Sequence, residues 1–209
     1  MDLLKIAQNI NSSLVDHFFK KIKNHYKKLN GLSLTFWGIS FKKGTDSLIN
    51  SPALKLINKL LKSGAIIHVY DPCFVKEKVF KIFKNYKYPH IKNPIKKIFL
   101  KIFPIKDELV YLREKIFEGK CYFHAKALDS LDKGEALIIG SDCDEFKQIP
   151  LSKIKETVSF IFDSRSTYLI EDLNKNGLSF YKKGFEFFKA DKHNENRLED
   201  HRDDHHGLV

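Results

Sequence analysis

Residues 32–72 read LSLTFWGISFKKGTDSLINSPALKLINKLLKSGAIIHVYDP, and this stretch determines the fold class. Leu32–Ile39 is an apolar, β-prone run, which predicts a strand. Ser51 before a proline predicts a helix start, because serine caps free N–H groups and proline suits the first helical position. The helix is expected over Pro52–Ser63 and a second strand over Ala65–Tyr70. Strand, loop, helix and strand in this order form a parallel α/β unit.

The same alternation returns in the C-terminal half of the chain. Strands are predicted at Cys121–His124, Ala136–Gly140, Val158–Asp163 and Leu178–Tyr181. Helices are predicted between them at Lys126–Asp132, Pro150–Glu156 and Tyr168–Asn176. The predicted fold class is therefore α/β: a Rossmann-like parallel sheet flanked by helices and preceded by a long N-terminal helix. Ligands of such sheets bind at the carboxyl ends of the strands. The candidate ligand-binding loops are therefore Ser40–Asn50, Asp71–Phe74, Ser141–Gln148 and Ser164–Thr167.

The long N-terminal helix is predicted over residues 2–29, and Gly31 follows it as a stop signal. Its apolar residues recur mostly three or four positions apart and form one stripe. The stripe consists of Leu3, Leu4, Ile6, Ile10, Leu14, Phe18, Ile22 and Tyr26. Such a stripe must be buried, either against the rest of this chain or against a second copy.

Composition bounds the class of protein. The chain has 209 residues, of which 43% are hydrophobic and 30% are charged, as in globular proteins. No uncharged apolar run approaches the roughly 18–20 residues of a membrane span, and the N-terminus does not resemble a secretory signal. Three widely spaced cysteines, Cys73, Cys121 and Cys143, predict neither a disulfide framework nor a zinc ribbon. A cytoplasmic location is the expectation.

The net charge of +11 comes from lysine, with thirty-three lysines and four arginines. Nucleic-acid recognition favours the guanidinium fork of arginine, so no nucleic-acid partner is expected. Residues 76–106 hold ten lysines and one acid. Charge runs of this kind are typical of a solvated surface, and an anionic partner is the alternative.

The loop Gly38–Leu54, with sequence GISFKKGTDSLINSPAL, combines a cation with a helix start. Lys42 follows the predicted strand, and the helix N-terminus favours an anion. These features suit a diphosphate or carboxylate, although an ordinary strand-to-helix loop has the same features.

This loop also resembles a family signature close to G-x-x-F-K-x-x-T-D-D-x-R-E-S-P-A, followed by G-A at Gly64-Ala65 and Y-D-P at Tyr70–Pro72. Further similar segments follow in the family's order: Glu135–Ile139, Ser141–Phe146, Phe162–Arg165 and Gly177–Gly184. Over roughly residues 6–185 the chain resembles the C-terminal UDP-binding domain of the UDP-glucose/GDP-mannose dehydrogenase family.

The resemblance implies a UDP-sugar site that uses Phe41, Lys42 and Arg165 for substrate binding. It also implies that residues 1–30 are part of the family's central dimerisation helix, and that residues 31–189 form the UDP-binding domain. Within that domain, residues 74–120 are expected to be a basic, helical insertion, with helices over Phe74–Tyr88 and Ile91–Lys120. Residues 190–209 are expected to be a disordered polar tail.

The departures from the family are equally specific. The complete family enzyme oxidises the C6 alcohol of a UDP-hexose with NAD. Neither a GxGxxG motif nor the catalytic G-x-C-x-P-K-D motif occurs here, and the three cysteines are interpreted as small buried hydrophobes. Ile49 replaces an arginine that the family associates with NAD, and Ser164 replaces a glycine. We therefore expect no cofactor on this chain, no activity alone, and either a homodimer or a separate NAD-domain chain.

Two features outside the motifs leave alternatives open. The histidines of the tail suit a metal, but a solvated tail is the simpler interpretation; they are His193, His201, His205 and His206. Ile95–Phe103 has an apolar face flanked by Lys96, Lys97 and Lys101, which suits either an anionic membrane or packing on the sheet, and packing is favoured. The alternative function is accordingly a non-catalytic binding or scaffold module whose basic insertion contacts a membrane or a polyanion.

Overall fold

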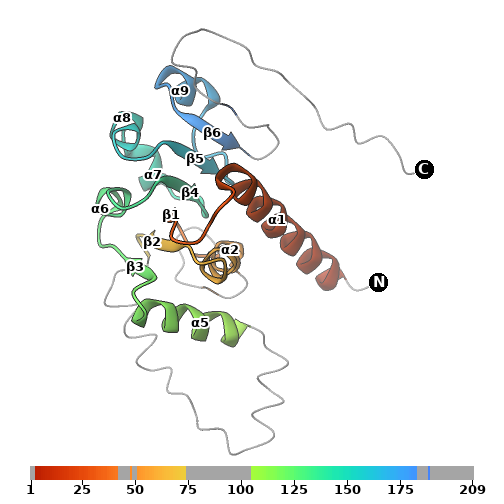
Figure 1. The fold of residues 1–209 in the computed structure, drawn as a ribbon. Coiled ribbons are helices and arrows are strands. Elements are labelled where there is room, and N and C mark those ends of the chain that lie inside the picture. Colours follow the sequence, from red (N-terminus) through yellow and green to blue (C-terminus); the bar gives the residue numbers. More distant parts are fainter. Residues whose placement is uncertain (1–2, 42–47, 49–50, 74–104, 183–187, 189–209) are drawn as a thin grey trace, which may run out of the picture.

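The computed structural model describes residues 3–41, 48, 51–73, 105–182 and 188, with side chains from Ser13 onward except in parts of 105–113. Its centre is a six-stranded parallel sheet in the order β3-β2-β1-β4-β5-β6 (Figure 1). The strands are β1 (Ser33–Trp37), β2 (Ile66–Tyr70), β3 (Cys121–Phe123), β4 (Ala136–Ile139), β5 (Phe160–Asp163) and β6 (Ser179–Lys182). The order reverses between β1 and β4, which is the switch point of a doubly wound sheet.

Two helical layers cover the sheet (Figure 1). The first layer comprises α1 (Leu3–Tyr26), α2 (Pro52–Lys62) and α5 (Ile105–Phe117). The second layer comprises α6 (Ala127–Leu131), α7 (Asp144–Gln148), α8 (Leu151–Lys155) and α9 (Ile170–Lys175). The predicted fold class, with its long N-terminal helix, is confirmed.

Strand β1 shows why the sheet is apolar on both faces. Leu34 and Phe36 pack in the core under the first layer, and Trp37 packs in the core under the second. All three side chains are fully buried, as expected for a strand covered on both sides. Two polar groups of this strand are satisfied by Ser130: Thr35 Oγ1 donates to its carbonyl at 2.7 Å, and Trp37 Nε1 donates to its Oγ at 3.0 Å.

Helix α1 uses its C-terminal half to cover the sheet. Val15, Phe18 and Ile22 are buried in the core of the first layer. Leu14 of the predicted stripe is 41% exposed in the single chain, and its neighbour Val15 is buried. The N-terminal half of α1 extends beyond the sheet (Figure 1).

Several sequence predictions need a correction or lie outside the described residues. The stretch Ser141–Gln148, expected to be a loop, contains helix α7. The helix predicted over Phe74–Tyr88 lies outside the described residues, as do positions 91–104 and the tail from 190; α5 begins at Ile105, after Pro104. The domain boundaries stay predictions.

The described residues also bear on metal, disulfide and membrane chemistry. All three cysteines are free, but only Cys121 is fully buried, and Cys73 and Cys143 are half-buried. Within the described ranges there is no group of three or more potential metal-ligating side chains. In the same part of the chain, no helix combines the length and the apolar character needed to cross a membrane.

Candidate functional site

At the switch point the ends of β1 and β4 approach each other closely. Gly38 has a left-handed backbone (φ 81°), and a Cβ placed there would lie 1.9 Å from Ser141 Oγ. A Cβ on Gly140 would lie 2.5 Å from the carbonyl oxygen of Gly38. Only glycine therefore fits either position without a shift of the neighbouring chain. The close approach places the loop after β1 beside the loop after β4.

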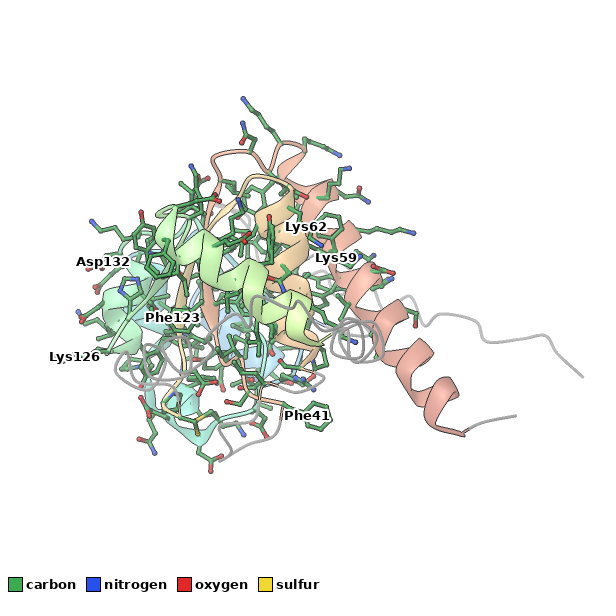
Figure 2. All side chains as sticks on the ribbon, turned by 90° about the horizontal axis from the view of Figure 1, so that it is seen from below. Phe41, Lys59, Lys62, Phe123, Lys126 and Asp132 are labelled. Atoms are coloured by element: carbon green, nitrogen blue, oxygen red, sulfur yellow. The ribbon has the colours of Figure 1, made fainter. Side chains whose placement is uncertain are left out.

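The loop after β1 is held by a carboxylate from the neighbouring strand. Asp71, which follows β2, is buried, and its Oδ2 accepts hydrogen bonds from Ile39 N at 2.7 Å, Ser40 N at 3.0 Å and Ser40 Oγ at 2.7 Å. Its Oδ1 accepts from Cys73 N at 2.8 Å. One carboxylate thus fixes the chain immediately before Phe41, which is 37% exposed and is labelled in Figure 2.

The far end of this loop is fixed by the start of α2. Ser51 is the N-cap residue, and its Oγ accepts from Leu54 N at 3.2 Å, as the sequence predicts. The same hydroxyl donates to the carbonyl of Ile39 at 2.6 Å. Both ends of the loop therefore meet at Ile39. Lys42 lies between them but outside the described residues.

The loop after β5 carries the predicted arginine. Asp163 is fully buried, and its two oxygens accept from Arg165 N at 3.0 Å and Tyr168 N at 3.1 Å. Ser164 Oγ donates to the carbonyl of Ile139 at 2.6 Å. Ser164 does not have the left-handed backbone that would strain a serine; within the described part of this loop that conformation falls on Ser166 (φ 55°).

The guanidinium of Arg165 is anchored at the switch point. Its Nε donates to the carbonyl of Gly140 at 2.9 Å, which leaves both terminal amino groups without a hydrogen-bond partner among the described residues. Desolvation lowers the pKa of Arg165, and the carboxylate of Asp142 opposes that change, so the side chain stays a cation. An oriented, charged donor fork of this kind suits a phosphate or carboxylate group.

Aromatic side chains at the ends of β1 and β2 pack against Phe146 of α7. Tyr70 donates a hydrogen bond to Glu145, and Phe146 packs against Trp37 with ring centroids 5.3 Å apart. Cys143, at the start of α7, has its pKa raised by burial, which disfavours a reactive thiolate.

The structure therefore places Phe41 and Arg165 at the same edge of the sheet, on the loops after β1 and β5. Sequence reasoning did not identify Asp71 and Asp163 as the residues that hold the two loops. The available signal was that each aspartate directly follows an apolar strand, at Tyr70-Asp71 and Phe162-Asp163.

Comparisons with known proteins point to one family. A family model described as the UDP-glucose/GDP-mannose dehydrogenase family, UDP binding domain, matches residues 35–170. UDP-glucose 6-dehydrogenase YwqF of Bacillus subtilis (strain 168) is 23% identical over 184 residues, which is 87% of this chain and 33% of that protein. Putative UDP-glucose 6-dehydrogenase YtcA of the same organism is 39% identical over 70 residues, 34% of this chain and 16% of that protein.

A solved structure shows the same fold. The NDP-N-acetyl-D-galactosaminuronic acid dehydrogenase of Methanosarcina mazei Go1 aligns with a TM-score of 0.54 at 14% identity, over 85% of this chain and 30% of that one. The present chain spans about a third or less of the length of the relatives it matches.

Proposed function

The chain belongs to the UDP-glucose/GDP-mannose dehydrogenase family and contains its UDP-binding domain, and on this basis we propose that it binds a UDP-sugar at the carboxyl edge of its sheet. It would form the nucleotide-sugar-binding part of a UDP-glucose 6-dehydrogenase-like oxidoreductase. The observation that supports this best is the anchored guanidinium of Arg165: its Nε donates to the carbonyl of Gly140, and its two amino groups have no hydrogen-bond partner among the described residues.

Three parts of the edge would share the ligand. Arg165 would pair with a charged oxygen of the diphosphate in a bidentate manner. The N-terminus of α2 adds the positive end of an 11-residue helix. Phe41 and Lys42, the Phe-Lys pair of the family signature, would contact the UDP-sugar from the loop that Asp71 holds.

The spacing of β1 and α2 supports an NAD site outside this chain. A dinucleotide fold joins its first strand to the following helix by a tight, glycine-rich turn. Here β1 ends at Trp37 and α2 begins at Pro52, with residues 38–51 of the sequence between them. We therefore propose that NAD, which the family uses, binds a domain outside these 209 residues. The chain alone would form no NADH from UDP-glucose, since covalent catalysis needs an activated thiolate.

We also propose a homodimer through the N-terminal half of α1, with a separate NAD-domain chain as the alternative partner. The supporting observations are the 41% exposure of Leu14 and the extension of α1 beyond the sheet (Figure 1). Sedimentation velocity at micromolar concentration tests this, and a monomer with intact helix content would contradict it. The three free cysteines support a cytoplasmic location.

The test of ligand binding is a thermal shift and calorimetric titration with UDP and UDP-glucose. A ligand that binds only the folded state raises the melting temperature by mass action. Lys42→Ala and Arg165→Ala should each weaken UDP binding about tenfold or more, because a charge-assisted hydrogen bond contributes roughly 1.5–3 kcal/mol. Arg165→Lys should also weaken it, since an ammonium cannot reproduce the bidentate fork.

The matched control replaces Lys96, Lys97 and Lys101 together by alanine, and UDP binding should not change. The proposal fails if millimolar UDP produces no shift in the wild type. It also fails if the control variant loses UDP while the Lys42 variant retains it, because the anion would then bind the insertion.

A further inference from the structure

The two helical layers differ in charge. In the first layer and the residues that directly follow its helices, the described side chains include ten lysines and three acids. The lysines are Lys20, Lys21, Lys23, Lys27, Lys28, Lys55, Lys59, Lys62, Lys115 and Lys120, and the acids are Asp16, Glu114 and Glu118. We call the ten lysines the basic face.

The second layer, with the loops that join its helices to the sheet, is slightly acidic. It carries seven basic and nine acidic side chains. The basic residues are Lys126, Lys133, Lys147, Lys153, Lys155, Arg165 and Lys175, and the acids are Asp129, Asp132, Glu135, Asp142, Asp144, Glu145, Glu156, Glu171 and Asp172. Figure 2 shows Lys59 and Lys62 beside α1 and α5, with Lys126 and Asp132 on the opposite side of the molecule.

A lysine-rich composition alone does not account for this contrast. A compositional bias toward lysine acts on the whole chain and would decorate both solvent-facing layers alike. Counted over the described side chains, the net charge is +7 on the first layer and −2 on the second. Within the described residues of this layer, three acids cannot neutralise ten lysines; Lys59 pairs with Asp16 at 2.6 Å, and Lys115 pairs with Glu118. The excess positive charge is thus a property of this face.

The chemistry of the face fits a lipid surface better than a nucleic acid. Its described cations are all lysines, which act as hydrated point charges and lack the planar fork used to recognise bases and phosphates. An exposed aromatic residue lies in the same layer: Phe117, at the end of α5, is 72% exposed. In sequence it lies between Lys115 and Lys120, with Glu114 and Glu118 also nearby. Basic residues around an exposed aromatic side chain are typical of peripheral binding at a bilayer interface.

We propose that the basic face docks on a bilayer containing anionic lipids, with Phe117 entering the interfacial region. Neither Phe117 nor any of the ten lysines belongs to the proposed UDP-sugar site, although α2 contributes its N-terminus to that site. The proposal is therefore independent of the proposed UDP-sugar site, and UDP binding serves as a separate measure of the folded state.

The experiment is co-sedimentation of the full chain with vesicles of phosphatidylcholine, with and without 30% phosphatidylserine, at 50 and 500 mM NaCl. The wild type should bind only the phosphatidylserine vesicles, and 500 mM NaCl should release it, because salt screens exposed charges. The triple variant Lys20→Glu, Lys23→Glu and Lys28→Glu should bind at least tenfold more weakly. Phe117→Ala should bind severalfold more weakly at unchanged charge.

The matched control is Lys126→Glu, Lys153→Glu and Lys175→Glu, which changes the net charge by the same amount on the other layer. These residues are exposed, as are the three in α1 and after it. The control should retain binding within about twofold. Glutamine versions of both triples repeat the comparison with a smaller charge change, in case a glutamate variant does not fold.

Three results would overturn the proposal. The first is that the wild type fails to bind phosphatidylserine vesicles at 50 mM NaCl. The second is that both triple variants lose binding equally, which would assign the effect to net charge. The third is that poly(U) displaces the vesicles at equal phosphate concentration, which would assign the face to nucleic acid.

Discussion

The loops after β1 and β5 leave the same edge of the sheet, and each is held by a buried aspartate, but the two aspartates work over different distances in the sequence. Asp163 accepts hydrogen bonds from Arg165 and Tyr168, two and five residues later. Asp71 accepts from Ile39 and Ser40, which precede it by 32 and 31 residues. The β5 loop therefore carries its own support, whereas the β1 loop has its geometry only when β2 is paired beside β1.

The difference has a consequence for binding. Phe41 follows Ser40 directly, so its position depends on the Asp71 contact across the sheet. Arg165 depends on the local Asp163 contact and on the carbonyl of Gly140. Of the two halves of the proposed site, the β1 half is expected to be the more sensitive to changes in the surrounding sheet.

The largest effect is expected for Asp71→Ala. The substitution leaves four donors without their acceptor: three backbone N–H groups and the hydroxyl of Ser40. A buried donor left without its acceptor costs about 1–3 kcal/mol, so the loss of all four contacts should cost about 3–5 kcal/mol of unfolding free energy. Asp163→Ala removes the acceptor of two described donors and should cost about 2–3 kcal/mol. Urea unfolding of both variants measures the difference, and a larger loss for Asp163→Ala would reverse the comparison.

Features that depend on nearby residues could be predicted from the sequence, and features that depend on distant residues could not. The strands, helix α2 and the Ser51 cap depend on nearby residues, and their prediction is confirmed. The role of Asp71 depends on a pairing between distant residues, which no local pattern specifies. Helix α7, with sequence DEFKQ, has a single buried apolar residue, Phe146, so periodicity gave no signal. Leu14 was placed on the stripe by spacing alone, but Val15 faces the sheet.

Glycine substitutions test the close approach between the ends of β1 and β4. Gly38→Ala combines a left-handed backbone with a Cβ 1.9 Å from Ser141 Oγ, and should cost about 3 kcal/mol. The matched control is Gly177→Ala, at φ 60°, where the Cβ meets only the flexible end of Lys155. It should cost about 1 kcal/mol, from the backbone conformation alone. Equal losses in thermal unfolding would show that the switch point relaxes around a methyl group.

Lowering the pH should destabilise strands β2 and β3 more than strands β5 and β6. His68 of β2 is buried, its Nδ1 lies 3.0 Å from His124 Nε2, and its ring stacks on Tyr122. Desolvation, with the nearby His124 and Lys133, lowers the pKa of His68 from 6.5 to about 4. The unfolded chain therefore binds a proton more readily, and stability falls as the pH drops from about 6.5 towards 4.

Between pH 7.5 and pH 5 this linkage removes about 2 kcal/mol of unfolding free energy. Urea unfolding at the two pH values measures the loss, and His68→Gln should reduce it. Hydrogen exchange should rise in β2 and β3 more than in β5 and β6. Uniform exchange across the sheet, or an unchanged pH dependence in the variant, would contradict this assignment.

The smallest effects are expected for the two serines that bond strand ends, and they give the finest test of the comparison. Ser51 Oγ both caps α2 and donates to the carbonyl of Ile39, so Ser51→Ala removes two hydrogen bonds and should cost about 1–2 kcal/mol. Ser164 Oγ donates once, to the carbonyl of Ile139, and Ser164→Ala should cost about 0.5–1 kcal/mol. One kcal/mol corresponds to roughly 2–4 °C in melting temperature for a domain of this size, so calorimetry can separate the two variants.

Because Ser51 closes the β1 loop at Ile39, its loss should also weaken UDP binding, whereas the β5 loop keeps the Asp163 contacts without Ser164. If Ser164→Ala proves the more costly for stability and for UDP, the β5 loop is not locally supported, and the contrast between the two loops does not hold.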